Sequence, residues 1–463
     1  MSLAGMVKRA MNAAAPPVAA MLGRAPYHWR PGAGEAYRRR AVELRAFRCW
    51  PVSRQKQYIL QRMRRLVAHA AENVPFYGEL YRRAGLSWRR LQRLEDLQCI
   101  PIVTKKMLRD TPLENRCWPC PDRISLNTGG SSGAALHFDA SQTCLAGEWA
   151  HMHEAWSLLG YRPWHLMIHF AGRNPKSGRP VVFNALRNQY APNLYSPRED
   201  ILSALRPHVL RYPVRYLHGY PSAVFDFANY ASRLAPDVVA QLRRTLRGVL
   251  LGSEYPVPAY RRRIEEVFGA RTLSWYGHTE MAVLAPERCE EGLYEPYHTY
   301  GFAEVVGQGP AGRLVGTDWE NLACPFIRYD TGDKVEAADT EDGLLRSFRI
   351  TAGREGDFVL DRLGQCISLT GLIFGKHHAA FDRAGHVQIC QDRPGQACLL
   401  VSEGGGRLSP RDLPALFDLE GVAIDFEYRL LSDPVRTAAG KVLLKVSPDQ
   451  LAATAGAAAT PGR

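Results

Sequence analysis

Apolar and polar positions follow a helical spacing through the first third of the chain. Residues 54–84 carry apolar side chains at intervals of three and four, and Gly85 follows as a residue that ends helices. A second amphipathic stretch predicts a helix over 142–159. This part of the chain is therefore expected to be mainly helical.

The pattern then changes to short apolar runs that alternate with helical stretches. The runs are typical of buried strands and lie at 165–170, 248–252 and 271–277. Helices are expected between them at 221–234 and 257–268. Such alternation predicts an α/β architecture with a largely parallel sheet.

Beyond about residue 300, short strands dominate the pattern. They are predicted at 302–306, 312–317, 325–329 and 343–348. From 356 a smaller unit of short strands follows, with two helices expected at 371–383 and 409–418. A chain of 463 residues is too long for one core. We expect an N-terminal arm (1–50), a large domain (51–355), a small domain (356–446) and a disordered tail rich in small residues (447–463).

Composition narrows the class of protein. Hydrophobic residues make up 46% and charged residues 23%, as in soluble globular proteins. No apolar run reaches the ~18–20 residues of a membrane span. Lysine and arginine interrupt the apolar stretches of the first 29 residues, which disfavours a secretory signal. A cytoplasmic protein is the expectation.

The net charge of +13 raises the question of a nucleic-acid partner. The arginines are spread along the chain, with the densest groups at 38–40 and 61–66, and no nucleic-acid-binding motif accompanies them. We therefore expect no nucleic-acid partner, and an anionic substrate would need only a local positive field.

The ten cysteines are scattered, as in a reduced protein. Cys117 and Cys120 have redox or zinc spacing but lack a second ligand pair. Cys289 with His278 and His298 is a weaker zinc candidate. Ordinary thiols are the favoured interpretation in both cases.

The stretch Leu126–Phe138, LNTGGSSGAALHF, contains three glycines between two apolar runs. Glycines let consecutive N–H groups approach one anion, and hydroxyl side chains add donors. The loop is neither a Walker A motif nor a dinucleotide fingerprint, because its spacing differs from both. The residues expected to hold phosphate are Thr128, Gly129, Gly130, Ser131, Ser132 and Gly133.

Further motifs follow in a fixed order. Tyr276–Glu280 (YGHTE) ends a predicted strand, where ligands of α/β proteins bind. Tyr329–Asp333 (YDTGD) ends another, Gly353-Arg354 comes later, and Arg436–Lys441 (RTAAGK) lies near the end. In this order the motifs resemble those of the adenylate-forming superfamily of acyl-CoA synthetases, adenylation domains and luciferases.

The N-terminal half is similar to one branch of that superfamily, the phenylacetate–CoA ligase-like proteins, which include relatives found with capsular-polysaccharide genes. The stretches that carry this similarity are Asn73–Tyr77, Leu94–Leu97, Ile100–Lys105, Tyr216–Ser222 and Gly252–Glu254. The resemblance covers roughly residues 65–446.

The resemblance implies an enzyme that joins a carboxylate to ATP, giving acyl-AMP and pyrophosphate, and then transfers the acyl group to a thiol such as that of CoA. It implies a large multi-layer α/β adenylation domain and a small mobile α+β C-terminal lid, with Gly356 at the hinge. Glu280 would bind Mg²⁺, a hard cation suited to oxygen ligands. Asp333 would hold the ribose hydroxyls and Arg354 the ribose or phosphate edge.

The remaining implied roles concern adenine and the reacting groups. The segments bordering ATP would be Gly252, Ser253, Glu254, Tyr276, Gly277, His278 and Thr279. Lys441 would bridge the substrate carboxylate and the α-phosphate. The acid pocket would draw on His165, Phe170, Arg173, His218, Tyr220 and Pro221. Catalytic roles thus fall to Lys441, Glu280 and Arg354.

Two departures from the family pattern keep alternatives open. Ala134 and Ala135 follow the glycine loop where many members have Gly-Lys-Pro, and Gly356 replaces an acid or lysine at the hinge. One alternative is an enzyme of the same kind whose acceptor is an amine or hydroxyl instead of CoA. Another is a nucleotide-binding scaffold that has lost catalytic activity. The sequence does not identify the acid, and it is compatible with a homodimer.

Overall fold

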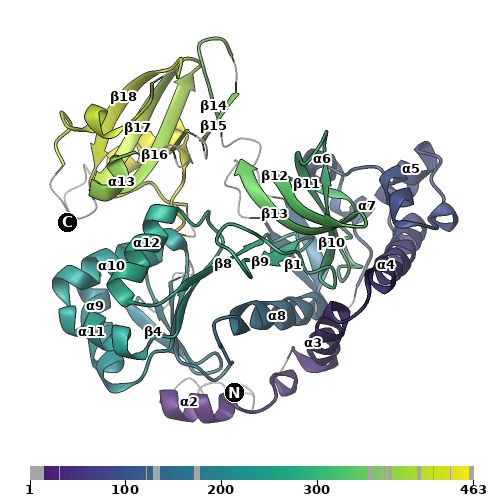
Figure 1. Ribbon diagram of the computed structural model, residues 1–463, viewed down its shortest axis with the longest axis horizontal. Coiled ribbons are helices and arrows are strands. Elements are labelled where there is room, and N and C mark those ends of the chain that lie inside the picture. The colour runs from purple at the N-terminus through teal and green to yellow at the C-terminus, as the bar shows by residue number, and fades with distance from the viewer. Residues whose placement is uncertain are drawn as a thin grey trace. The chain divides into compact units, whose positions relative to one another are not determined.

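The computed structural model describes residues 15–30, 32–120, 122–128, 136–170, 178–194, 196–352, 358–364, 366–369, 372–373, 378–403, 408–420, 422–437 and 440–457. The chain divides into two compact units. Unit 1 comprises Met1–Gly23, Trp164–Thr272 and Glu355–Arg463, and unit 2 comprises Arg24–Pro163 and Leu273–Arg354. Figure 1 gives the labels of the elements.

Unit 2 begins with helices that match the predicted helical part. They are α3 (Gly34–Arg48), α4 (Val52–Asn73), α5 (Pro75–Arg83), α6 (Lys105–Asp110), α7 (Leu113–Arg116) and α8 (Gln142–Ser157), with 3₁₀ turns at Tyr27–Trp29, Trp88–Arg90 and Leu94–Cys99. In α4 the buried residues Ile59, Met63 and Leu66 recur at helical spacing. Residues 34–48 of the predicted arm form α3, which packs on α8.

The helix predicted over 54–84 is in fact two helices. Pro75 lacks the N–H that would continue α4, and it disfavours helical backbone at the residue before it. Val74 accordingly has extended dihedrals, with φ −119° and ψ 107°, and Pro75 starts α5. Gly85 ends α5 in the left-handed region, with φ +61°, as predicted.

The strands of unit 2 pair with one another in antiparallel fashion. β1 (Arg123–Asn127) pairs with β2 (His137–Ser141), and β8 (Thr272–Gly277) pairs with β9 (Leu284–Pro286). A four-stranded sheet has the order β10 (Gly301–Val306), β11 (Ala311–Asp318), β12 (Tyr329–Glu341) and β13 (Leu344–Ala352).

The predicted strand at 325–329 is wrong except at its last residue. Arg328 has a φ of +45°, which breaks an extended strand, so β12 starts only at Tyr329. The Arg328 guanidinium donates to the carbonyls of Gln98 and Ile100 and pairs with Glu304. This buried ion pair anchors the turn that leads into β12.

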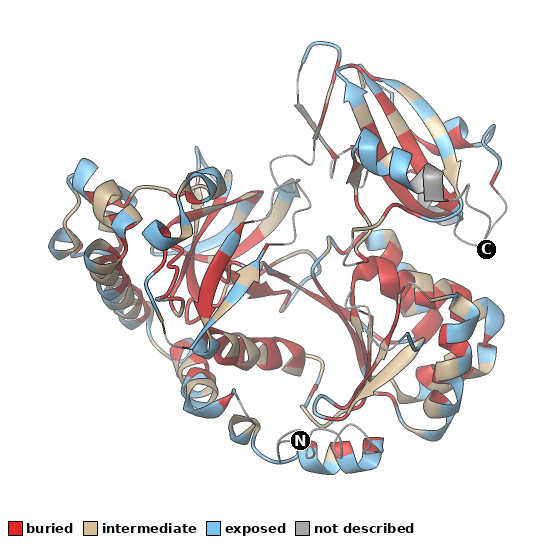
Figure 2. Ribbon diagram, turned by 180° about the vertical axis from the view of Figure 1, so that it is seen from behind, coloured by how far each residue is buried: buried red, intermediate tan, exposed pale blue. Residues whose placement is uncertain are grey.

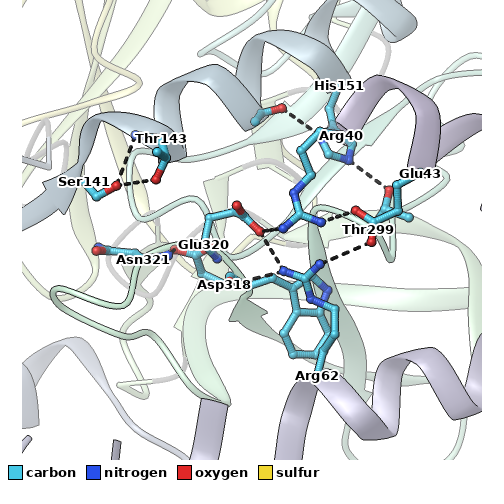
Figure 3. Close-up of polar contacts among 12 residues, drawn as sticks. Arg40, Glu43, Arg62, Ser141, Thr143, His151, Thr299, Asp318, Glu320 and Asn321 are labelled. Atoms are coloured by element: carbon cyan, nitrogen blue, oxygen red, sulfur yellow. Dashed lines mark hydrogen bonds and ion pairs between the residues drawn. The ribbon is translucent and has the colours of Figure 1, made fainter. Parts of the chain in front are cut away.

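A buried charge cluster joins the helices of unit 2 to the segment after β11. Figure 3 shows Arg40 and Arg62 facing the carboxylates of Glu43 and Glu320. Arg62 lies 2.6 Å from Glu320. Buried charges require partners of opposite sign, and here both arginines have them. The cluster fixes α3 and α4 beside the start of the turn at Asp318–Asn321.

Unit 1 contains a mostly parallel sheet, as predicted. Its strand order is β4 (Val181–Asn184), β5 (Gln189–Pro192), β3 (Met167–Phe170), β6 (Tyr216–Gly219) and β7 (Gly248–Leu251), with only β4 antiparallel. The helices are α2 (Pro16–Gly23), α9 (Arg198–Arg211), α10 (Pro221–Leu234), α11 (Pro236–Thr245) and α12 (Pro258–Phe268). Figure 2 shows buried residues along the strands and exposed ones on the outer helix surfaces.

The C-terminal part of unit 1 is a small α+β domain. Its main sheet has the order β18 (Asp425–Leu431), β17 (Gln396–Glu403), β16 (Ala384–Arg393) and β19 (Lys445–Val446). A separate hairpin joins β14 (Phe358–Leu360) to β15 (Cys366–Ser368). The α/β fold with a small C-terminal domain is thereby confirmed.

The helices of this small domain differ from the prediction. The stretch 409–418 forms only a 3₁₀ turn, Leu413–Leu416, because Pro414 lies inside it. In the described part of 371–383, residues 372–373 are helical and α13 covers Ala380–Arg383. The tail predicted to be disordered instead contains a helix, α14 (Pro448–Ala457). Alanines favour helix, and Leu451 packs against an apolar cluster around Val446.

One cysteine pair also differs from the prediction of ordinary thiols. Cys117 and Cys324 form a disulfide, with their Cα atoms 4.3 Å apart. Cys120 and Cys289 are free. Within the described ranges, no group of three or more His, Cys, Asp or Glu residues could hold a metal ion. No helix in the described part of the chain has the length and apolar character needed to cross a bilayer.

Candidate active site

The predicted site residues fall into two groups, one in each unit. Unit 1 contains Phe170, His165, His218, Tyr220, Pro221, Gly252, Ser253, Glu254 and Lys441, and unit 2 contains Thr128, Tyr276, Gly277, His278, Thr279, Glu280 and Asp333. Outside the described residues lie Gly129, Gly130, Ser131, Ser132, Gly133, Arg173, Arg354 and Gly356.

Tyr276 and Asp333 meet inside unit 2. Tyr276 belongs to β8 and Asp333 to β12, and the phenol donates a hydrogen bond of 2.5 Å to Asp333 Oδ2. Both side chains are buried. A charged acceptor strengthens such a bond, so the pair fixes the orientation of the carboxylate.

Glu280 lies nearby in the sequence and is also buried, with 3% of its surface exposed. Its Oε1 accepts a hydrogen bond from the Tyr329 phenol at 2.8 Å, and its Oε2 lies 3.2 Å from Nδ1 of His278. The other ring nitrogen of His278 is buried and has no partner in the described part of the chain. A buried polar atom without a protein partner is available to pair with a water or a ligand.

Thr128 lies at the start of the glycine loop and is hydrogen-bonded to Leu136 on the other side of it. Its N–H donates to the Leu136 carbonyl at 3.0 Å, and its Oγ1 accepts from the Leu136 N–H at 2.9 Å. Both residues flank the β1–β2 hairpin, whose register aligns Asn127 with His137. The hairpin therefore fixes the two ends of the loop, and the hydroxyl oxygen already accepts one hydrogen bond.

In unit 1 the predicted residues lie at the carboxyl ends of parallel strands. β6 ends at Gly219 and β7 at Leu251, and His218 pairs with Leu250 in the sheet. Gly219 has a φ of +155°, and a Cβ there would lie 2.0 Å from the Phe170 carbonyl oxygen. Only glycine fits, and the chain then turns through Tyr220 into α10. This edge is where open α/β sheets bind ligands.

His218 has a defined ring environment at that edge. It stacks on His169, with ring centroids 4.4 Å apart and planes 8° apart, and its Nδ1 lies 3.1 Å from the Leu250 carbonyl. Since the carbonyl can only accept, Nδ1 carries the proton. Burial lowers the pKa of His218 to about 4, so the ring is neutral near pH 7.

Two members of the predicted acid pocket do not join this edge. His165 precedes β3, at the opposite end of the strand, where its ring lies 5.6 Å from that of Tyr216. Phe170 is 1% exposed and packs on Phe227 at 4.7 Å in the hydrophobic core. The side chain of Phe170 faces the helix layer because alternate residues of a strand point to opposite faces.

Lys441 lies in a tight hairpin of the C-terminal domain. The Thr437 N–H donates to the Lys441 carbonyl at 2.9 Å, and the Lys441 N–H donates to Thr437 Oγ1 at 3.2 Å. Its ammonium nitrogen lies 5.5 Å from the centroid of the Tyr220 ring. The structure thus brings Lys441 to the sheet edge that carries Tyr220.

Glu254 connects this hairpin to the large-domain part of unit 1. Its Oε2 accepts from the Ser222 N–H and its Oε1 from the Val442 N–H, both at 3.1 Å. Burial raises the pKa of Glu254, although Ser222 and the cations of Lys441 and Arg436 act in the opposite direction. Glu254 therefore holds the backbone beside Lys441 in addition to its predicted place near adenine.

Sequence reasoning missed a second connection, made by Asp226, His386 and Arg436. Asp226 Oδ1 lies 2.8 Å from His386 Nε2, and Oδ2 lies 2.6 Å from Arg436. The available signal was Asp226 itself, an acid within the apolar run of α10, since buried carboxylates require partners. Its partners are distant in the sequence and had no detectable signal.

Comparison with known proteins shows what the chain is similar to. No protein-family model matches the chain. It is 24% identical over 328 residues to a phenylacetate–coenzyme A ligase of Escherichia coli, covering 65% of this chain and 71% of that protein. It is 26% identical over 299 residues to the Thermus thermophilus ligase of the same name, covering 59% and 63%.

Solved structures give the fold. A 2-hydroxyisobutyryl-CoA ligase in complex with an acyl-AMP has a TM-score of 0.62 and 19% identity, covering 88% of this chain and 92% of that one. An anthranilate CoA ligase with anthranoyl-AMP has a TM-score of 0.50 and 14% identity, covering 80% and 77%. The resemblance predicted from the motifs is confirmed: the chain is similar in sequence to phenylacetate–CoA ligases and in fold to CoA ligases of known structure.

Proposed function

We propose that this chain is an adenylate-forming ligase that activates a carboxylic acid with ATP and transfers the acyl group to the thiol of CoA. The observation that carries the proposal is Lys441, placed beside Tyr220 and Glu254 at the carboxyl edge of a parallel sheet. The names of its relatives support the same class, since they are CoA ligases.

The first half-reaction joins the acid to AMP. A carboxylate oxygen attacks the α-phosphorus of ATP, the bond to the bridging oxygen breaks, and pyrophosphate leaves. Negative charge accumulates around the α-phosphate in the transition state. Lys441 supplies a fixed cation for this charge, and such a contact is worth roughly 3–4 kcal/mol.

Unit 2 supplies the residues that would bind the nucleotide. Asp333, oriented by Tyr276, would accept hydrogen bonds from both ribose hydroxyls. Tyr276 would border adenine together with Gly252–Glu254 of unit 1, Gly277–Thr279 would also contact ATP, and Thr128 with the loop 129–133 would hold the terminal phosphates. The role of Arg354 at the ribose or phosphate edge belongs to the same proposal.

Glu280 fits a magnesium ion. Mg²⁺ is usually bound by one or two carboxylates together with substrate phosphates and waters, and Glu280 offers one such buried carboxylate. Its Tyr329 and His278 partners orient it. Mg²⁺ would neutralise phosphate charge when bound.

The second half-reaction consumes the acyl-AMP. The CoA thiol loses its proton to solvent, its sulfur attacks the acyl carbon, and AMP leaves with the electrons of the anhydride bond. In the proposed cycle, the small domain moves about Gly356 between the two steps. A cytoplasmic location and a homodimer remain predictions.

ATP–pyrophosphate exchange with a panel of aryl and hydroxy acids tests the proposal. Exchange that depends on the acid is expected, followed by release of AMP and formation of a thioester when CoA is added. Formation of an amide or ester with an amine or hydroxyl, and no thioester with CoA, would show that the acceptor is that amine or hydroxyl. ATP binding without exchange on any acid would favour a scaffold and contradict the proposal.

A further inference from the structure

The carboxylate of Asp226 joins two parts of unit 1 that are far apart in the sequence. Asp226 lies on α10, and it contacts His386 of β16 and Arg436 of the C-terminal hairpin. The Tyr260 phenol of α12 bonds the other ring nitrogen of His386 at 2.8 Å. Two elements thus contact the acid directly and α12 contacts it through His386, while the side chain of Asp226 is 18% exposed.

The charge state of Asp226 suits this role. Burial raises the pKa of Asp226, but ion pairing and hydrogen bonding with His386, together with the charge of Arg436, outweigh it and hold the pKa well below its usual range. Asp226 is therefore a carboxylate at neutral pH, and Arg436 is its permanent cationic partner.

Arg436 links Asp226 to the backbone next to Lys441. One guanidinium nitrogen contacts Asp226 at 2.6 Å, and another donates to the Gly440 carbonyl at 3.1 Å. Gly440 directly precedes Lys441, so the two-pronged side chain connects Asp226 to the backbone beside Lys441. The base of the same hairpin is held by Gln388, which bonds Val435 and the Leu443 carbonyl.

We propose that Asp226, His386 and Arg436 form a latch that positions Lys441 for acyl-adenylate formation, and that this latch must open before acyl transfer. The inference rests on the proposed function and assigns positioning residues to its first half-reaction. The latch residues hold the lysine and do not touch the reacting atoms. Loss of the latch should therefore slow the first step and spare the second.

The test separates the two half-reactions in Asp226→Asn and Arg436→Gln proteins. Each variant should lower the kcat of ATP–pyrophosphate exchange by roughly tenfold, as for a misplaced catalytic group, with KM for ATP within about twofold. Thioester formation from supplied acyl-AMP and CoA should stay within about twofold of the parent rate. Arg436→Lys, which keeps the charge but loses the fork, should restore activity only in part.

Combining two variants distinguishes a role of the latch in positioning Lys441 from a general structural defect. In a Lys441→Ala background, Asp226→Asn should cause no further loss of exchange, because the latch acts through Lys441. Asp433→Asn is the matched control. Asp433 lies three positions before Arg436 in the sequence, and its carboxylate forms an exposed ion pair with Arg198 at 3.3 Å. Removing this ion pair should leave both half-reactions unchanged.

Hydrogen exchange measures the latch without catalysis. The peptide covering 435–443 should exchange roughly tenfold faster in Asp226→Asn than in the parent, while peptides of β3 and β6 keep their protection. Unchanged exchange of that peptide, or equal slowing of both half-reactions, would overturn the latch while leaving the proposed function intact. A parent protein without pyrophosphate exchange on any acid would overturn the proposed function and the catalytic role of the latch together.

Discussion

The phenol of Tyr276 and the carboxylate of Asp333 lie 2.5 Å apart, although the two residues are 57 positions apart in the sequence. Asp333 also receives support from its own turn, because its N–H donates to Thr331 Oγ1 at 3.2 Å. A carboxylate held in this way keeps one orientation before the ligand arrives. Preorganisation of this kind reduces the free energy lost on binding.

Tyr276→Phe should weaken ATP binding. The change removes a hydrogen bond to a charged acceptor, worth about 1.5–3 kcal/mol, while the ring keeps its packing. We expect KM for ATP to rise roughly tenfold with little change in melting temperature. Steady-state kinetics and thermal unfolding measure both, and an unchanged KM would contradict the role of the pair.

Glu280→Gln should lower adenylation at least roughly tenfold, because a neutral amide is a poor ligand for Mg²⁺. The amide still accepts the Tyr329 hydrogen bond, so the unfolding midpoint of the ligand-free protein should change little. The measurement is pyrophosphate exchange across a Mg²⁺ titration. Activity that persists after complete chelation of divalent cations would show that the assignment of Glu280 is wrong.

Lys441→Ala should slow acyl-adenylate formation by a factor of roughly 10² or more, as for loss of one placed transition-state contact. Transfer from supplied acyl-AMP should continue near the parent rate. Gly356→Pro is expected to do the reverse, since proline fixes φ at the proposed hinge. Single-turnover assays of each step decide the matter, and equal slowing of both steps by Lys441→Ala would rule out alternating use of the lysine.

Asp318 should make the protein less stable as the pH rises. Burial raises its pKa to about 8, although it accepts hydrogen bonds from the N–H groups of Glu320 and Asn321. In the unfolded chain the same carboxyl ionises near pH 4. Between these values the folded state binds more protons, so the free energy of unfolding contributed by Asp318 falls from about pH 4 to about pH 8.

Asp318→Asn should remove that slope. Urea unfolding at pH 5 and pH 8 measures it, with exposed Asp110→Asn as the control that keeps the parent slope. Glu320 does not interfere in this range. Its pKa is lowered because the charges of Arg40 and Arg62 outweigh burial, so it acts only at more acid pH. A variant with the parent slope would contradict the assignment.

Periodicity and short apolar runs predicted those elements whose pattern is continuous along the chain. The helix at 221–234 has the bounds found in α10, and the predicted strand at 248–252 matches β7 within one residue. Failures arose where a single residue changed the backbone, as at Pro75, Arg328 and Pro414. Local propensity does not include the tertiary contacts that stabilise such turns.

The candidate site likewise contains contacts that the sequence motifs predicted and contacts that they did not. Motif order placed Tyr276 with Asp333 in one expected nucleotide region, and the two side chains do meet. Spacing could not indicate that Asp226 meets Arg436, because the two residues are 210 positions apart and only the fold brings them together. Phe170 was expected in the acid pocket, and its side chain lies in the hydrophobic core.

Unit 1 is assembled from three separate stretches of chain, and the last of them carries the lysine. During synthesis from the N-terminus, the sheet edge of β6 and β7 leaves the ribosome long before residue 441. Under the proposed function, a growing chain can already fold its central sheet but cannot yet adenylate an acid. Competence for the reaction therefore requires that residue 441 has been synthesised and that its hairpin has docked.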